Sequence, residues 1–221
     1  MNDRPDPDDV FNLDGLLHGP SSPPAPVRIV PANEASWEDL EAIFGGRGDH
    51  RGCWCQRQKM SGRDWYYHGV SVDERARRLR EETHCDQPDA GATSGLVAYW
   101  DDEPVGWCRV EPRSVFVRLG QAPWVGRKED PKAPGIWAIA CFVTKKGYRH
   151  KGVSRAMAIA AVDFARSRGA KALEGYGMIT KPGEDITWGE LHVGAVTAFA
   201  AAGMREVHRP SKRRVVMRID F

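Results

Sequence analysis

The sequence predicts an α+β fold in which a mixed, mostly antiparallel central sheet is flanked by helices. Residues 95–100 and 105–110 have the pattern of two strands, and the turn Asp101-Asp102-Glu103-Pro104 joins them into an antiparallel hairpin. After residue 135 the pattern runs strand, helix, strand, helix, strand, which is the order of a mixed sheet. With 221 residues, 41% of them hydrophobic, the chain is long enough for one domain with a buried core.

Residues 1–26 differ in composition from the rest of the chain. They hold five aspartates against one arginine and end in a proline-rich run, so they can bury little apolar surface. We expect a mobile tail here and a folded domain over residues 27–221. Nothing resembles a secretory signal, no stretch has the roughly 20 apolar residues that span a bilayer, and five irregularly spaced cysteines do not suggest a disulfide framework. A cytoplasmic protein with no membrane partner is the expectation.

Local patterns predict the other elements. Ser71 and Glu74 form a capping box at the start of a charged surface helix, and Val153 and Met157 fall on one face of a later helix. The near-continuous apolar run 136–143 indicates a buried central strand rather than an edge strand. In chain order we expect a strand at 27–30, helices at 35–44 and 72–84, the hairpin, a long loop at 119–135, the strand at 136–143, a helix at 149–168, a strand at 172–176, a helix at 191–202, and one or two closing strands at 207–221.

The segment 136–157 carries the clearest chemical signal. A buried strand leads through a short loop into a helix, and a helix start offers unpaired backbone N–H groups and the positive end of the helix dipole. Gly152 allows a phosphate to approach the backbone closely. Five cations without an acid among them surround this position: Lys145, Lys146, Arg149, Lys151 and Arg155. The segment therefore predicts a phosphate-binding site.

The P-loop of nucleotide hydrolases has the same order of elements, with the pattern G-x-x-x-x-G-K-S/T. Residues 147–154 match this pattern except that Val153 stands where the lysine must be. Without a lysine to reach the terminal phosphates, a P-loop is disfavoured.

Two motifs resemble the GNAT superfamily of N-acyltransferases. The run Arg149-His150-Lys151-Gly152-Val153-Ser154 is similar to the coenzyme A signature Gln/Arg-x-x-Gly-x-Gly/Ala, with Ser154 as a departure in the last place. Downstream, the frame of Ala195 to Met204 resembles the motif A-x-x-x-Y-x-x-x-G-F, but Phe199 replaces the tyrosine that commonly protonates the leaving thiolate. The resemblance covers residues 27–221, and the Cys-Trp-Cys segment at 53–55 resembles a bacterial subgroup whose acceptors are mostly unassigned.

The resemblance implies a GNAT-type fold and transfer of an acetyl group from acetyl-CoA to an amine of a small molecule or peptide, by direct attack in a ternary complex. It implies that the amides of residues 151–155 hold the pyrophosphate and that the backbone of residues 142–143 pairs with pantetheine. The cofactor-binding residues that it implies are Phe142, Val143, Arg149, His150, Lys151, Gly152, Val153, Ser154, Arg155 and Phe199. Two alternatives stay open: a non-catalytic acyl-CoA sensor and a metal-binding interaction module built on cysteines. A homodimer is also left open.

Direct transfer needs a base for the amine and a hydrogen-bond donor for the thioester oxygen. A backbone N–H near Phe142 or Val143 is the expected donor. Glu174 and Tyr176 alternate onto one face of the strand 172–176, so they are the catalytic candidates, although a solvated or capping carboxylate is the competing interpretation of Glu174. His192, at the start of the last helix, is expected to be a surface histidine.

Large aromatic residues in loops often mark binding surfaces. Trp54, Trp124 and Trp188 are therefore expected to line the acceptor pocket with Glu190, although burial against the sheet explains such tryptophans equally well. No metal is expected, because Cys53 and Cys55 lack the usual zinc spacing and a second pair. The net charge is only +2, and basic residues near the C-terminus are expected to protect a sheet edge rather than bind nucleic acid: Arg205, Arg209, Lys212, Arg213 and Arg214.

Overall fold

The computed structural model describes residues 27–45, 52–66, 69–119, 126–181 and 186–221. The expected tail at 1–26 and Trp124 lie outside the described residues.

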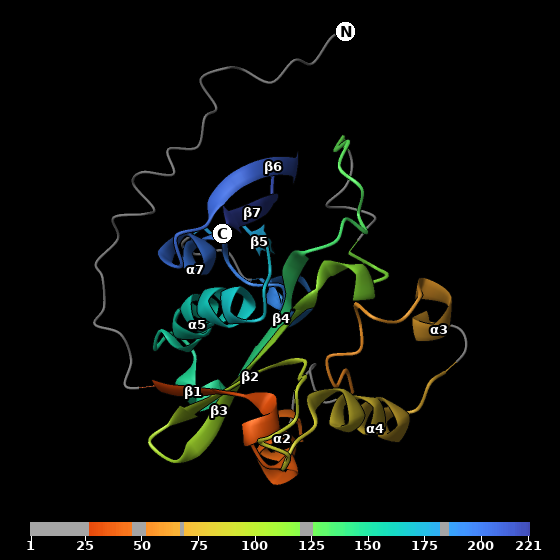
Figure 1. Cartoon of the computed structure of the whole chain (residues 1–221), viewed down its shortest axis with the longest axis vertical. Coiled ribbons are helices and arrows are strands. Elements are labelled where there is room, and N and C mark those ends of the chain that lie inside the picture. The colour runs from red at the N-terminus through yellow and green to blue at the C-terminus, as the bar shows by residue number, and fades with distance from the viewer. Residues whose placement is uncertain (1–26, 46–51, 67–68, 120–125, 182–185) are drawn as a thin grey trace, which may run out of the picture.

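The fold is built on a mixed sheet of seven strands in the order β1-β2-β3-β4-β5-β7-β6 (Figure 1). All neighbouring strands are antiparallel except β4 and β5, which are parallel. This confirms the predicted fold class, the hairpin and the central position of the apolar run. The strands are β1 (Val27–Pro31), β2 (Gly95–Trp100), β3 (Glu103–Pro112), β4 (Ile136–Thr144), β5 (Ala172–Met178), β6 (Arg205–Ser211) and β7 (Arg214–Asp220).

Helices cover both faces of the sheet (Figure 1). They are α2 (Trp37–Phe44), α3 (Gly62–Tyr66), α4 (Val72–Thr83), α5 (Val153–Ser167), α6 (Trp188–Leu191) and α7 (Val196–Ala201), with 3₁₀ turns η1 (Ala32–Glu34), η2 (Arg113–Val115) and η3 (Lys146–Tyr148). On one face α5 and α7 enclose a core that includes Met157 and Phe199. On the other face α2 and α4 enclose a second core that includes Leu40 and Trp107.

Two predicted helices are shorter than expected. The helix predicted from Arg149 begins at Val153, because His150 (φ 60°) and Gly152 (φ 83°) adopt the left-handed conformation, which cannot continue a helix. Of the helix predicted over 191–202, the longer helical part is α7; α6 ends at Leu191, and the chain breaks between them at Gly194 (φ 104°). A Cβ at Gly194 would come within 2.8 Å of the rings of Phe142 and Phe199, so this break also needs glycine for space.

Strands β4 and β5 separate partway along their length. They pair only over Ile136–Ile139 and Ala172–Gly175. Just beyond, the register between β3 and β4 shifts, so that Ala140 is an extra residue in β4 and forms a bulge.

The four residues 192–195 fill the space between the separating strands. The Phe142 N–H of β4 donates to the His192 carbonyl (2.6 Å), and the Met178 N–H of β5 donates to the Gly194 carbonyl (2.8 Å). The break between α6 and α7 therefore supplies the backbone partners that these two strands cannot give each other. We call this place the β4–β5 gap.

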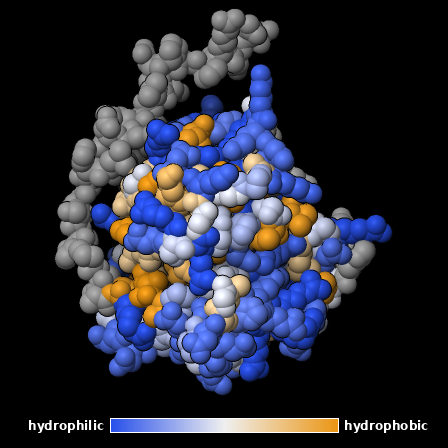
Figure 2. Space-filling view, in the orientation of Figure 1, coloured by the Kyte–Doolittle hydropathy of each residue, from blue (hydrophilic) through white to orange (hydrophobic). Residues whose placement is uncertain are grey.

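The molecular face seen in Figure 2 is mostly polar, and its hydrophobic patches are small and separated. Among the helices of the described segments, none is long and apolar enough to cross a bilayer.

Candidate active site

The loop between β4 and α5 has the geometry of an anion-binding cradle. Gly152 is the N-cap of α5, and the first bond of the helix runs from the Ala156 N–H to the Gly152 carbonyl (2.9 Å). From His150 to Arg155, no backbone N–H donates to a backbone carbonyl of the residues that the structure describes. These amides lie at the positive end of the dipole of a 15-residue helix.

The cations around this cradle are mostly available to a ligand. Lys145 pairs with Glu103 (2.6 Å), whereas none of the other four basic residues forms a salt bridge within the described parts of the chain. Lys151 lies 5.2 Å from the centre of the Tyr148 ring, and the Arg149 Nε donates to the Thr144 carbonyl (3.3 Å). A loop with open amides, available cations and no carboxylate of its own fits the pyrophosphate of coenzyme A.

Two residues expected at the cofactor have other partners. The N–H of Phe142 is already paired with His192, as described above, and its ring packs on Phe199 at 5.8 Å. Phe199 is fully buried, because Gly175 and Gly194 leave the space that its ring fills. Phe199 is thus a core residue and presents no exposed surface to a ligand, which corrects the expectation that it contacts the cofactor.

Glu174 lies at the centre of a buried ion-pair cluster. Its carboxylate accepts from Arg127 (2.9 Å), Arg113 (3.1 Å), Arg218 (3.1 Å) and the Tyr176 hydroxyl (2.9 Å), and the residue is 0% exposed. Burial alone would raise its pKa, but Arg127 and Arg113 outweigh burial and hold the pKa below its usual value. A saturated, buried carboxylate has no route to an amine, so the geometry does not support the expected role of Glu174 as a base.

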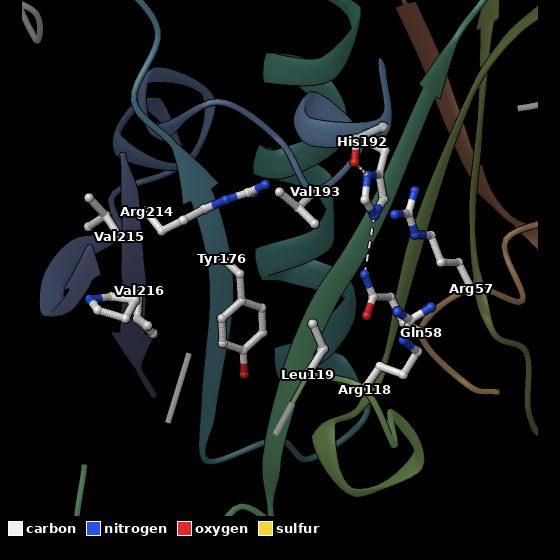
Figure 3. A pocket seen from close by; sticks show the side chains of 12 residues that line it. Arg57, Gln58, Arg118, Leu119, Tyr176, His192, Val193, Arg214, Val215 and Val216 are labelled. Carbon is white, nitrogen blue, oxygen red and sulfur yellow. Dashed lines mark hydrogen bonds between the residues drawn. The ribbon is translucent and has the colours of Figure 1, made fainter. Parts of the chain in front are cut away.

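Tyr176 does not supply the missing proton transfer either. Burial, and then the neighbouring Glu174, raise the pKa of Tyr176 well above its usual value. Its hydroxyl stays protonated and donates to Glu174, while the ring faces a cavity (Figure 3).

This cavity has a volume of about 290 Å³ and opens beside the β4–β5 gap, on the face of the sheet opposite α5 (Figure 3). Gln58 and Arg118 lie on one side, Tyr176 and Arg214 on the other, and His192 at the head. Its principal lining residues are Arg57, Gln58, Arg118, Leu119, Tyr176, His192, Val193, Arg214 and Val216. The volume suits a small molecule or one side chain of a peptide.

His192 is a buried, neutral residue and not the surface histidine that was expected. It is 5% exposed, and its ring lies against Trp188 with 5.3 Å between the ring centres. Because a carbonyl only accepts, Nδ1–H donates to Gly189 (3.0 Å), and Nε2 is left to accept from the Gln58 amide (3.2 Å). Burial, and then the charge of Arg57, lower the pKa of His192 to about 4.

This lowered pKa predicts an acid-sensitive contribution to stability. Below its unfolded pKa of about 6.5, the unfolded chain binds a proton that the folded protein does not, until the pH reaches about 4. The free energy of unfolding should therefore fall by about 1–3 kcal/mol as the pH drops from 6.5 to 4, and His192→Gln should remove this part of the fall. Urea denaturation at pH 7 and pH 4.5 measures the difference. Equal losses in the two proteins would contradict the assignment.

The other residues expected in the acceptor pocket lie in three different places. Trp54 stacks between Trp37 (5.4 Å) and Phe44 (5.3 Å) in the α2-side core, so it is not a pocket residue. The Trp188 ring lies against the His192 ring, which lines the cavity. Glu190 accepts from Arg213 (3.0 Å) at the exposed rim.

The cysteines are packed near one another in the interior. Cys53, Cys55 and Cys141 are all buried thiols, and burial raises the pKa of Cys53 to about 11. Cys55 differs: burial would raise its pKa, but a hydrogen bond from Cys141 and the charge of Arg109 lower it. Over the described residues, no group of three or more His, Cys, Asp or Glu side chains is arranged to hold a metal ion.

Most residues of the cavity were not predictable from the sequence. Arg57 and Gln58 come two and three residues after the Cys-Trp-Cys segment, which is the one signal that could have drawn attention to them. Arg118 and His192 come from elements far apart in the chain, and Arg214 was assigned to edge protection.

A model of the family described as Acetyltransferase (GNAT) family matches residues 63–176, which is more than half of the chain. The chain belongs to the GNAT acetyltransferase family. Acetyl-CoA is the acyl donor of these enzymes and is therefore the cosubstrate of this GNAT protein.

One of three similar solved structures, the first below, supports the GNAT assignment at the level of the fold. A putative acetyltransferase from Salmonella typhimurium with its cofactor acetyl-CoA is 11% identical, with 88% of this chain and 93% of that chain covered and a TM-score of 0.50. An N-acetyltransferase from Thermoplasma acidophilum in complex with coenzyme A is 13% identical (88% and 99% covered, TM-score 0.47). A ribosomal-protein-alanine N-acetyltransferase from Brucella melitensis is 14% identical (88% and 99% covered, TM-score 0.47). No curated protein sequence matches this GNAT protein.

Proposed function

We propose that this GNAT protein transfers the acetyl group of acetyl-CoA to an amine of a small molecule or peptide, by direct attack in a ternary complex. The observation that carries the proposal is the cavity at the β4–β5 gap, in which the ring of His192 is neutral and its Nε2 accepts a hydrogen bond from Gln58. Acetyl-CoA supplies the thioester, and the amides and cations of residues 149–155 would hold its pyrophosphate.

The cavity favours the reactive, neutral form of the amine. A lysine-like amine has a pKa of about 10.4 in water and is mostly protonated at neutral pH. Next to the guanidinium groups of Arg57, Arg118 and Arg214, a protonated amine is electrostatically disfavoured, so its pKa falls. The protein thus supplies part of the deprotonation through fixed charges.

His192 then accepts the proton that the neutral amine loses during the reaction. An amine N–H that reaches Nε2 replaces the Gln58 amide as its donor, and Nε2 takes the proton while the new bond between nitrogen and the acetyl carbon forms. With a pKa of about 4, protonated His192 releases the proton readily, and the proton ends on the leaving sulfur. Phe199 has no acidic proton, so it cannot protonate the sulfur as a tyrosine at that position would. Proton transfer from His192 to the sulfur takes the place of that step.

Release of free thiol from acetyl-CoA in the presence of an amine panel tests the proposal. Amine-dependent thiol release, together with a product heavier by one acetyl group in mass spectrometry, is the expected result. Saturable binding of acetyl-CoA with no amine-dependent release would overturn the proposed transfer and leave an acyl-CoA sensor.

Replacing His192 by glutamine should lower kcat/KM by about 100-fold, at the low end for a general base because its pKa lies well below neutral pH. The affinity for acetyl-CoA should stay within about threefold, since the His192 carbonyl that binds β4 remains. His208→Gln on β6 is the matched control and should behave as the wild type. A His192→Gln enzyme with unchanged kcat/KM would exclude His192 as the base.

A further inference from the structure

Within the described parts of the chain, three arginines line the cavity without a carboxylate to neutralise them. Arg57, Arg118 and Arg214 are all partly buried, and none of them forms a salt bridge to an acid in the described residues. Glu190 lies close enough to attract Arg214, but its carboxylate is bonded to Arg213 (3.0 Å). Arg118 lies against the Tyr66 ring, 5.3 Å from its centre.

Four other arginines that are buried on this side of the sheet are neutralised by carboxylates. Arg109 is paired with Glu111 (2.7 Å) and also with Glu82. The cluster around Glu174 and Glu129 neutralises Arg113, Arg127 and Arg218. Among the described residues, Arg75 on α4 is also partly buried without a salt bridge, and its guanidinium donates to the Gly52 carbonyl. The cavity differs because it brings three such arginines together.

Unmatched guanidinium groups in a partly closed cavity are costly, because they lose water without gaining a partner. Two observations show this cost. The Nη1 atom of Arg118 is buried and has no hydrogen-bond partner among the residues that the structure describes. Burial lowers the pKa of Arg214, and the positive charges of Arg213 and Arg57 lower it further. A ligand that carries negative charge would relieve both.

We propose that the acceptor is an amine that also carries a carboxylate or a phosphate, with its anionic group held by Arg118, Arg214 and Arg57 and its amine at His192. This inference rests on the proposed function. Guanidinium groups bind carboxylates and phosphates through paired, charge-assisted hydrogen bonds, and two or three such groups fix the orientation of a small acceptor. The apolar side chains of Leu119 and Val193 then contact the carbon atoms between the two ends.

The same charges exclude other amines. A polyamine or another multiply charged cation would bring further positive charge to three arginines and would be repelled. The cavity therefore selects by charge as well as by size.

Matched pairs of acceptors test the inference. An amino acid and its carboxamide differ only in the carboxylate, whereas phosphoethanolamine and ethanolamine differ only in the phosphate, so the two pairs also distinguish the sources of negative charge. For at least one pair, the anionic member should show a kcat/KM about 10- to 100-fold higher. Arg118→Gln and Arg214→Gln should each reduce this ratio at least about fivefold, mainly through KM.

Arg205→Gln is the matched control: Arg205 is exposed on β6, pairs with Asp220 (3.3 Å), and its replacement removes the same charge far from the cavity lining. The control should keep the wild-type ratio. The inference is overturned if neutral and anionic members react equally, or if the pocket variants lose both members in proportion.

Failure of the proposed function gives a different result. If no amine is acetylated although acetyl-CoA binds, transfer fails, but the arginine site is still testable by calorimetry with N-acetylglutamate as the probe. Binding by the wild type that is lost in Arg118→Gln and kept in Arg205→Gln would support an anion site. Equal binding, or none, in all three proteins would overturn it.

Discussion

Replacing Glu174 by glutamine should lower the free energy of unfolding by about 3–5 kcal/mol, the range for breaking a buried ion pair by removing one partner. The substitution keeps the shape of the side chain but leaves Arg113, Arg127 and Arg218 with Glu129 as their shared carboxylate. Those guanidinium groups stay mostly buried without full compensation. Thermal and urea denaturation measure the loss.

Glu103→Gln is the appropriate control for this experiment. Glu103 also accepts from a cation and a tyrosine, Lys145 and Tyr148, but the pair lies at the surface, where solvent screens it. We expect a much smaller change there. Equal losses for the two variants would contradict the central position given to Glu174.

Replacing Gly152 by glutamate should weaken acetyl-CoA binding by about 1,000-fold, or ~4 kcal/mol. Gly152 has a φ of 83°, which a side chain rarely adopts, and it caps the helix whose open amides form the cradle. A carboxylate there repels the pyrophosphate and occupies its place. Calorimetry with acetyl-CoA measures the affinity, and a melting curve of the variant separates lost binding from lost folding.

The matched control is Gly147→Glu in the same loop. It introduces the same charge, but Gly147 has no positive φ and no atom within 4 Å of a Cβ placed there. Its affinity should fall by less than about tenfold, through long-range charge alone. If both variants bind acetyl-CoA equally weakly, the loop acts only through its net charge. That result would contradict the proposal that its backbone amides bind the pyrophosphate.

The parts of the fold that depend on local pattern were predictable from the sequence. Strand β4 is apolar along its length because it is covered on both faces, and the hairpin is marked by its turn. The basic loop before Val153 was also recognisable, since residue type and spacing within a few positions define it.

Features that depend on partners far apart in the chain were not predictable. The alanine-rich pattern after Leu191 suits a continuous helix, and only the separation of β4 from β5 explains why the chain breaks at Gly194. Likewise, the position of Glu174 on its strand was foreseen, but its partners Arg127 and Arg218 lie 47 and 44 residues away. His192 was misjudged for the same reason, because Gln58 lies 134 residues before it.

The packing of Phe199 limits how this protein could evolve. The end of its ring points to where a Cβ on Gly194 would stand (2.8 Å), and its side lies against Gly175, where a Cβ would meet the ring at 2.5 Å. A hydroxyl group added by a single mutation to tyrosine would enter this closed apolar space and not a site of proton transfer. A tyrosine acid at this position would require coordinated changes at the glycines and in the break between α6 and α7. A Phe199→Tyr substitution alone would therefore not supply a general acid at this position.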